Sequence, residues 1–203
     1  MAQAKSTGAS ATARRDGRRA GAGERSAGRT REALLAAGVA VAARDGLAGL
    51  SVNGVVAEAG VAKGTFYVHF SDREAFVDAL HAAFHERVLA AVEEATADTP
   101  PGAERIWLGA EAYLDVCLRE RAIKALALEA RTDSTLTETM SARHERFAAS
   151  AIPSIRAMGW PEAASASQLL AAMTSEIAIR ELEAGRKLPA ARRSLRRFLG
   201  LPA

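Results

Sequence analysis

The chain has 203 residues, of which 49% are hydrophobic and 25% are charged, with a formal net charge of +3. This balance is typical of a soluble globular protein and excludes a wholly disordered chain. No uninterrupted apolar stretch approaches the roughly 20 residues that span a bilayer, and the N-terminal region lacks the apolar segment of a secretory signal. The single cysteine, Cys117, leaves no disulfide framework within one chain. We therefore expect a cytoplasmic protein with no membrane partner.

The positive charge is concentrated at the N-terminus. Residues 1–31 hold eight basic side chains against two acidic ones, a local net charge of +6, so the remaining residues carry −3. Residues 1–29 are rich in Ala, Gly, Ser, Thr and Arg and have almost no large apolar side chain, which predicts a disordered basic arm. Such an arm is either a passive leader or an electrostatic contact to DNA phosphates or a minor groove, and the sequence leaves both open.

Three helices are predicted between residues 30 and 70. The first ends at Gly46, because glycine tolerates a left-handed C-terminal cap. The second and third are separated by a bend at Gly60, which predicts a helix-turn-helix arrangement. The expected boundaries are the N-cap Thr30 with a helix over 31–44, the N-cap Ser51 for the second helix, and a third helix over 62–70.

The rest of the chain is also predicted to be helical. Ser71 and Glu74 have the spacing of a capping box at the start of a helix that extends to Thr96. Pro153 is expected to kink or interrupt a later helix, because proline cannot donate the backbone hydrogen bond of a helix interior. The other helices are expected over 102–119, 121–131, 134–157, 161–184 and 189–199. The predicted fold class is all-α.

The most informative motif follows the first predicted helix. Residues 31–50 read REALLAAGVAVAARDGLAGL, and residues 51–76 read SVNGVVAEAGVAKGTFYVHFSDREAF. The order is a capping Ser, an apolar helix that ends in Ala-Gly-Val, then Ala-Lys-Gly-Thr, an aromatic residue, Tyr-x-His-Phe and Arg-Glu. This order resembles the N-terminal DNA-binding domain of TetR/AcrR-family transcriptional regulators over its full length. The spacing holds through three helices and their caps, which is far more specific than a bare helix-turn-helix.

The third predicted helix has the residue types that a recognition helix needs. Small residues at its start let the backbone approach the bases, and Lys63 can donate to guanine O6 and N7. Phe66 and Phe70, four residues apart, are expected in the core instead. The resemblance implies base contacts from Lys63, Gly64, Thr65 and Tyr67, and phosphate contacts from Ser51, Ala62, His69 and Arg73. The alternative is a helical pair buried in an ordinary bundle, in which Lys63, Tyr67 and His69 are ordinary surface residues.

Two residues depart from the pattern of the family. Val68 stands where a polar or aromatic residue is frequent, so one phosphate contact is expected to be missing. Ala62 stands where serine is frequent and leaves only its amide for a phosphate. Both changes are expected to lower DNA affinity without breaking the fold.

The C-terminal part resembles the family in the number and order of its helices. The resemblance implies a pocket for an unidentified small-molecule effector among the middle helices, and a homodimer through the last two long helices. Leu170, Met173 and Ile177 recur at helical spacing and are expected in the dimer interface. The candidate ligand-binding residues mix aromatic, sulfur-containing and polar groups and are Trp107, Tyr113, Cys117, Met140, His144, Phe147 and Glu176.

Other reactive residue types are interpreted as structural. One stripe at helical spacing contains His81 and His85 with the acids Glu74 and Asp78. We expect its side chains to be exposed to solvent and not to bind a metal. Four arginines of the last helix are expected on its solvent-exposed face, or paired with acidic residues across a dimer interface. They are Arg192, Arg193, Arg196 and Arg197. No phosphate-binding glycine loop, zinc spacing or nucleophile elbow is present. The sequence therefore favours no enzyme, metal or cofactor.

Three segments follow from these patterns: a basic arm over 1–29, a DNA-binding domain over 30–75 and a ligand-binding and dimerisation domain over 76–203. The expected function is that of a sequence-specific regulator, a dimeric repressor that a small molecule releases from a double-stranded DNA operator. The competing class is a helical binding or scaffold protein that keeps this fold without recognising DNA.

Overall fold

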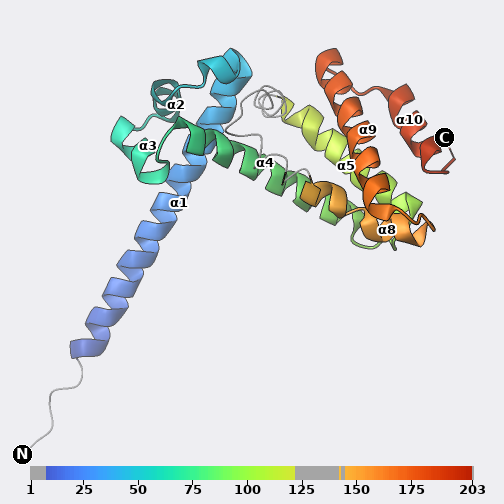
Figure 1. Cartoon of the computed structure of the whole chain (residues 1–203). Helices are drawn as coiled ribbons and strands as arrows, with labels where there is room; N and C mark the ends of the chain where they lie inside the picture. The colour runs from blue at the N-terminus through green and yellow to red at the C-terminus, as the bar shows by residue number, and fades with distance from the viewer. Residues whose placement is uncertain (1–7, 122–141, 143–144, 203) are drawn as a thin grey trace, which may run out of the picture.

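The computed structural model describes the backbone of residues 8–121, 142 and 145–202, and within these residues every regular element is a helix. The predicted all-α fold class is confirmed. Figure 1 shows the N-terminal helices gathered at one end of α4 and the C-terminal helices at the other. The helices are α1 (Gly8–Gly49), α2 (Val52–Ala59), α3 (Lys63–His69), α4 (Arg73–Thr96), α5 (Ala103–Arg119), α8 (Ile152–Ala157), α9 (Ala163–Ala184) and α10 (Pro189–Phe198).

Helix α1 begins much earlier than the sequence predicts. Its backbone is helical from Gly8, where disorder was expected, and the helix projects away from the remainder of the molecule (Figure 1). Thr30, the expected N-cap, lies inside the helix, and its hydroxyl donates to the carbonyl of Ser26 at 3.0 Å. Alanine and arginine are strong helix formers, which explains how the helix extends through this segment. Gly46, the predicted stop, is a kink inside α1 with φ 66° and ψ −168°.

The cap of α4 differs from the prediction by one residue. Asp72, and not Ser71, is the N-cap, and its Oδ1 atom accepts a hydrogen bond from the Ala75 amide at 2.7 Å. The Ser71 hydroxyl donates to Asp72 Oδ2 at 2.9 Å. The Ala75 amide and the Ser71 hydroxyl hold the pKa of the Asp72 carboxyl below its ordinary value. Asp and Ser are both favoured N-cap residues, and here the extended backbone is at Asp72.

An aromatic cluster joins α3 to α4. Phe66 and Phe70 are buried, as predicted, and their rings lie 5.3 Å and 4.9 Å from the ring of Phe76. Edge-on and tilted arrangements of this kind are favourable for aromatic pairs. One continuous hydrophobic core extends from this cluster along α4 to α5, α9 and α10. Helix α4 therefore belongs to both ends of the molecule.

The later helices agree with their predicted bounds to within about three residues where the structure describes them. Pro153 lies in the first turn of α8, so the helix predicted over 134–157 is interrupted before Ile152. The predicted helix over 121–131, apart from Arg121, and the start of the one over 134–157 lie outside the described residues. Among the described helices, none is both long and apolar enough to cross a membrane.

Two side chains that were expected to be solvated are buried. His81 is 5% exposed, and its ring centroid lies 4.5 Å from that of His85 in an edge-to-face arrangement. Arg192 is 6% exposed and pairs with Glu181 and Asp115 of its own chain, with N–O distances of 2.6 Å in both cases. The prediction that Arg192 lies on the solvent-exposed face of the last helix is wrong, because α10 packs this residue against α5 and α9.

Candidate functional site

The bend between α2 and α3 is set by two local features. The Ser51 hydroxyl accepts a hydrogen bond from the Gly54 amide at 3.1 Å, which caps α2. Gly60 ends α2 in the left-handed conformation with φ 65°, and the Val61 amide then donates back to the Val56 carbonyl at 3.0 Å. Both features were predicted and both are confirmed. Together they direct α3 across the end of α2.

Helix α3 has one buried and one exposed face. Phe66 is fully buried, whereas Tyr67 is 51% exposed and Val68 is 79% exposed. Lys63 and Gly64 are also exposed, one turn before Tyr67 and Val68. In Figure 1 the helix lies at the outer edge of the N-terminal domain, away from α5, α8, α9 and α10. The outward face therefore combines a cation, a phenol and an apolar side chain.

The other predicted contact residues surround this face. Ala62 is the exposed N-cap of α3, and no side chain caps the helix there. Thr65 and His69 are half-buried at the edge of the helix. Arg73 donates from Nε to the Leu50 carbonyl at 2.7 Å, so it ties the start of α4 to the residue before the Ser51 cap. No local pattern in the sequence indicates this contact, because it joins residues 23 positions apart.

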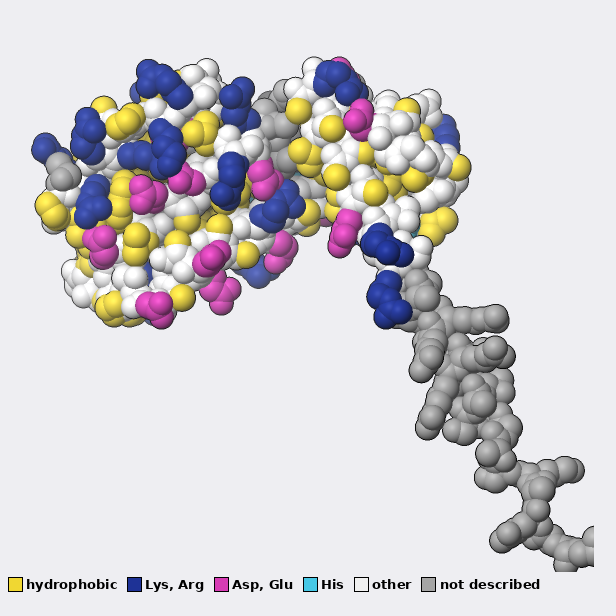
Figure 2. All heavy atoms as spheres, turned by 180° about the vertical axis from the view of Figure 1, so that it is seen from behind, with side chains coloured by type: hydrophobic (Ala, Val, Ile, Leu, Met, Phe, Trp, Pro, Cys, Tyr) yellow, Lys and Arg dark blue, Asp and Glu magenta, His cyan; other side chains and the backbone are white. Residues whose placement is uncertain are grey.

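Basic side chains of α1 lie at the same end of the molecule as α2 and α3. Arg25 and Arg29 are exposed on α1, where Figure 2 shows basic groups at the base of the projecting helix. The Arg31 guanidinium lies over the Phe70 ring, with its carbon 5.2 Å from the ring centroid. Arg31 thereby contacts the residue that ends α3. The part of α1 with described side chains is thus basic where it meets the helix-turn-helix.

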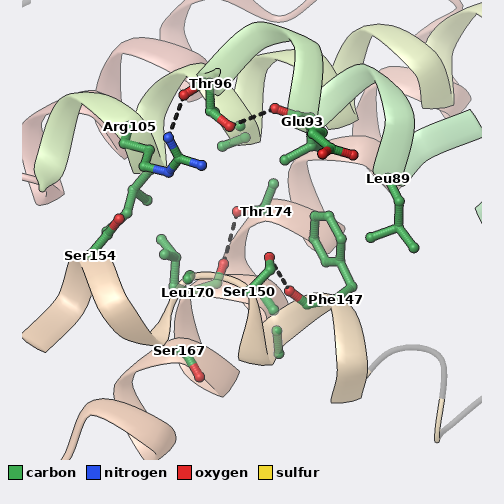
Figure 3. Close-up of a pocket in the computed structure, with 17 residues that line it drawn as sticks. Leu89, Glu93, Thr96, Arg105, Phe147, Ser150, Ser154, Ser167, Leu170 and Thr174 are labelled. Atoms are coloured by element: carbon green, nitrogen blue, oxygen red, sulfur yellow. Dashed lines mark hydrogen bonds between the residues drawn. The ribbon is translucent and has the colours of Figure 1, made fainter. Parts of the chain in front are cut away.

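A cavity of about 350 Å³ lies between α4, α5, α8 and α9. Its lining is mainly apolar, and in Figure 3 the Phe147 ring and Thr174 project toward its centre. Glu93 and Arg105 lie on opposite sides of the cavity. The hydroxyls of Thr96, Ser150, Ser167 and Thr174 each donate to a carbonyl three or four residues earlier in the chain, at 2.7–2.8 Å. With those protons committed, the same oxygens can offer lone pairs to a ligand.

Of the predicted ligand-binding residues that the structure describes, Phe147 alone lines this cavity. Trp107 is buried outside the cavity lining, with the Arg196 guanidinium carbon 5.4 Å from its ring centroid, and Cys117 is buried in the core. Tyr113 is buried and does not line the cavity, and its ring centroid lies 5.0 Å from that of Phe147. Glu176 is exposed and pairs with Arg180 at 2.7 Å. Met140 and His144 lie outside the described residues.

Comparisons with known proteins agree with this geometry. Residues 34–80 match the family model of bacterial regulatory proteins, tetR family. Among solved structures, a transcriptional regulator from Rhodococcus sp. Rha1 is 24% identical, with a TM-score of 0.74 over 84% of this chain and 94% of that one. A putative TetR-family transcriptional regulator from Rhodococcus sp. is 21% identical, with a TM-score of 0.74 over 84% of this chain and 98% of that one.

The multidrug binding protein EbrR, solved with imidazole, is 22% identical, with a TM-score of 0.66 over 85% of this chain and 96% of that one. No curated protein matches the sequence. At these identities the solved structures establish the fold, and the family model covers the helix-turn-helix and the first part of α4.

Proposed function

From the match to the N-terminal domain of the tetR family and from the fold of TetR-type transcriptional regulators, we propose a function for this chain. It is a dimeric repressor that a small molecule releases from its operator. In this proposal α3 is the recognition helix. The DNA-binding role rests mainly on one observation: Phe66 anchors α3 in the core, while Lys63 and Tyr67 of the same helix remain exposed.

The proposed contacts follow from that face. Lys63 and Tyr67 would meet base edges, with Gly64 and Thr65 close to the groove floor. Ala62 and His69 would meet phosphates from the two ends of α3, and Ser51 and Arg73 from the ends of α2 and α4. Ser51 and Arg73 already hold intramolecular hydrogen bonds. Their contribution would therefore combine positioning of the helices with contact to the backbone of DNA.

The effector site in this proposal is the cavity between α4 and α9. Leu89, Val92 and Thr96 of α4 line it, and Phe76 near the other end of α4 packs in the N-terminal core. A ligand that fits the cavity better in one orientation of α4 would shift the orientation of the helix-turn-helix by its differential affinity. The solved EbrR complex shows that a protein of this fold holds a small molecule, which supports a small-molecule role for the cavity.

The dimer in this proposal uses the exposed faces of α9 and α10. Leu169, Met173 and Phe198 are 67%, 39% and 75% exposed within one chain, whereas Leu170 and Ile177 are each 9% exposed. The sequence-based interface was therefore wrong for Leu170 and Ile177, which face the core of their own chain. A large exposed apolar set on two adjacent helices supports a partner surface. Two half-sites on successive major grooves require such a pair of subunits.

The competing class, a helical scaffold that does not recognise DNA, is tested by an electrophoretic mobility shift with the duplex upstream of the gene itself. We expect a specific complex that resists competition by unrelated DNA. Replacing Lys63 with Ala should weaken specific binding by about 1–3 kcal/mol with little change in thermal stability. Lys187→Ala is the matched control, because Lys187 pairs with Asp115 in the C-terminal domain at 2.8 Å.

Equal losses of specific and non-specific binding in Lys63→Ala would place Lys63 on phosphates. Absence of any specific complex across duplexes from the flanking genes would favour the scaffold class.

A further inference from the structure

Val68 is the most exposed large hydrophobic side chain among those that the structure describes, at 79%. It lies in the seven-residue helix α3, two residues after the fully buried Phe66. A β-branched residue restricts its own rotamers in a helix, so helix propensity does not favour valine here. The fold of the single chain thus provides no packing partner that would account for an apolar side chain at this position.

Gly64 lies one turn before Val68 on the same side of α3. A Cβ atom added to Gly64 would meet nothing within 4 Å, and its backbone is in the ordinary helical region. Neither packing nor backbone strain therefore requires glycine there. Glycine in a helix does cost stability relative to alanine. Its effect at this position is to leave the backbone of α3 open to a close approach from outside.

Gly64 and Val68 form an apolar stripe on the outward face of α3. The stripe runs beside Lys63 and Tyr67, which are also one turn apart and exposed. A cation and a phenol next to the stripe suit a polar, anionic partner better than an apolar protein surface. The side chain of Val68 can neither donate nor accept a hydrogen bond. Whatever Val68 recognises in such a partner has to be an apolar group.

We infer that Val68 is a specificity-determining residue that contacts the 5-methyl group of a thymine in the major groove. Thymine is the standard base that presents a methyl group there, and apolar side chains recognise it by contact. Gly64 allows α3 to lie deep enough for the short valine side chain to reach that methyl group. The inference rests on the proposed DNA-binding function, and it gives a base preference to a residue for which the sequence predicted only the absence of a phosphate contact.

The experiment begins with selection of duplexes from a pool with a randomised 30-base-pair centre, using the full-length protein. Each thymine of the enriched duplex is then replaced in turn by deoxyuridine, which removes only the 5-methyl group. We expect the wild-type protein to lose about fourfold in affinity at one thymine in each half-site, the effect of one buried methyl group. Val68→Ala alters both subunits of the proposed dimer, so it should lose about the product of two such factors on the thymine duplex and show no further loss on the deoxyuridine duplex.

Two measurements separate a base contact from a general effect. A 5-methylcytosine at the same position should bind the wild-type protein more tightly than cytosine does, because it restores the methyl group. Val68→Ala should unfold at the wild-type temperature or slightly above it, since the side chain is largely exposed and alanine is the better helix former.

The inference is overturned if the wild-type protein is insensitive to deoxyuridine, or if Val68→Ala keeps the full sensitivity. It is also overturned if Val68→Ala changes the oligomeric state without DNA, which would assign the residue to a protein contact. Failure to enrich any sequence would overturn the proposed DNA-binding function, and this inference with it. Enrichment without a methyl effect at any thymine would overturn this inference alone.

Discussion

Phe76 packs against the backbone of α1 at Gly38, so closely that a Cβ atom on Gly38 would lie 2.5 Å from the Cζ atom of Phe76. The contact joins α1 of the N-terminal domain to α4, whose other end lines the cavity. Leu80, one turn further along α4, would also lie only 3.1 Å from such a Cβ atom. Glycine at this position thus sets how closely α4 approaches α1.

Replacing Gly38 with Ala should destabilise the protein by about 1–3 kcal/mol, because an extra methyl group in a closed contact forces side chains or helices apart. The measurement is urea unfolding followed by circular dichroism. The control is Gly28→Ala in the same helix, where a Cβ atom meets nothing within 4 Å. That variant should be stabilised by up to about 1 kcal/mol, because alanine is the better helix former. If both variants are stabilised alike, α4 is not held against Gly38.

Local signals predicted the helix-turn-helix well. The Ser51 cap and the Gly60 turn depend on residues within five positions of each other, so a short stretch of sequence contains all the groups that take part. The cap of α4 was placed one residue early, because Ser71 and Asp72 can both accept a hydrogen bond from the first turn. The sequence alone does not say which of two adjacent acceptors has the extended backbone that a cap needs.

Contacts between distant residues were not predictable in the same way. Arg192 pairs with Asp115 at a separation of 77 residues, so nothing in the local pattern of α10 showed that this arginine is buried. Helix α9 has apolar residues on both sides, so periodicity could not tell whether Leu170 or Leu169 faces the core. The sequence around Thr174 contains no motif that marks a cavity residue. Its position in the cavity depends on how α9 packs against α4 and α5.

Removing one partner of the buried pair of Arg192 and Glu181 should cost far more than removing both. Arg192 donates from Nε and Nη2 to the two carboxylate oxygens of Glu181, and Glu181 also accepts from the Leu188 amide at 2.8 Å. Arg192→Met leaves a buried carboxylate without its cation, a loss of about 3–5 kcal/mol. Adding Glu181→Leu should recover much of that loss in urea unfolding. If the double variant is no more stable than Arg192→Met, the pair does not account for the loss.

The same pair predicts a pH dependence. Burial by itself would raise the pKa of the Glu181 carboxyl, but the hydrogen bonds from Arg192 and the Leu188 amide bring it below its ordinary value. A carboxyl whose pKa is lower in the folded state contributes stability above the pKa of the unfolded state, about 4.3, and loses it as the pH falls through the folded value. The free energy of unfolding should therefore fall below about pH 4.3, and less steeply in the double variant.

The basic segment before α2 should act through its charge. Deleting residues 1–28 removes six basic side chains and should flatten the slope of log affinity against log salt by about 0.9 for each phosphate that the protein then leaves unneutralised. A full-length variant with those six residues replaced by Gln tests charge without shortening α1. Both should remain folded in circular dichroism. An unchanged slope in both would make the segment a passive leader.

The proposed dimer is tested on the exposed face of α9 and not on its buried face. Sequence periodicity placed Ile177 in the interface, but this side chain is buried within one chain. Ile177→Glu would therefore unfold the monomer, and its effect could not be assigned to a loss of dimerisation. Leu169→Glu with Met173→Glu places like charges on both subunits where the helices would meet across a two-fold axis. Light scattering should then show folded monomers, and operator binding should be lost although α3 is unchanged.

The matched control is Ala90→Glu with Ala95→Glu, which adds two charges at exposed positions of α4. That variant should stay dimeric and bind the operator, because its new charges lie on α4 and not on the exposed residues of α9 and α10 that form the proposed interface. The loss in the α9 variant would then come from assembly, since one recognition helix covers only a few base pairs and a single half-site binds weakly. A dimeric α9 variant that binds DNA normally would show that the subunits meet through another face.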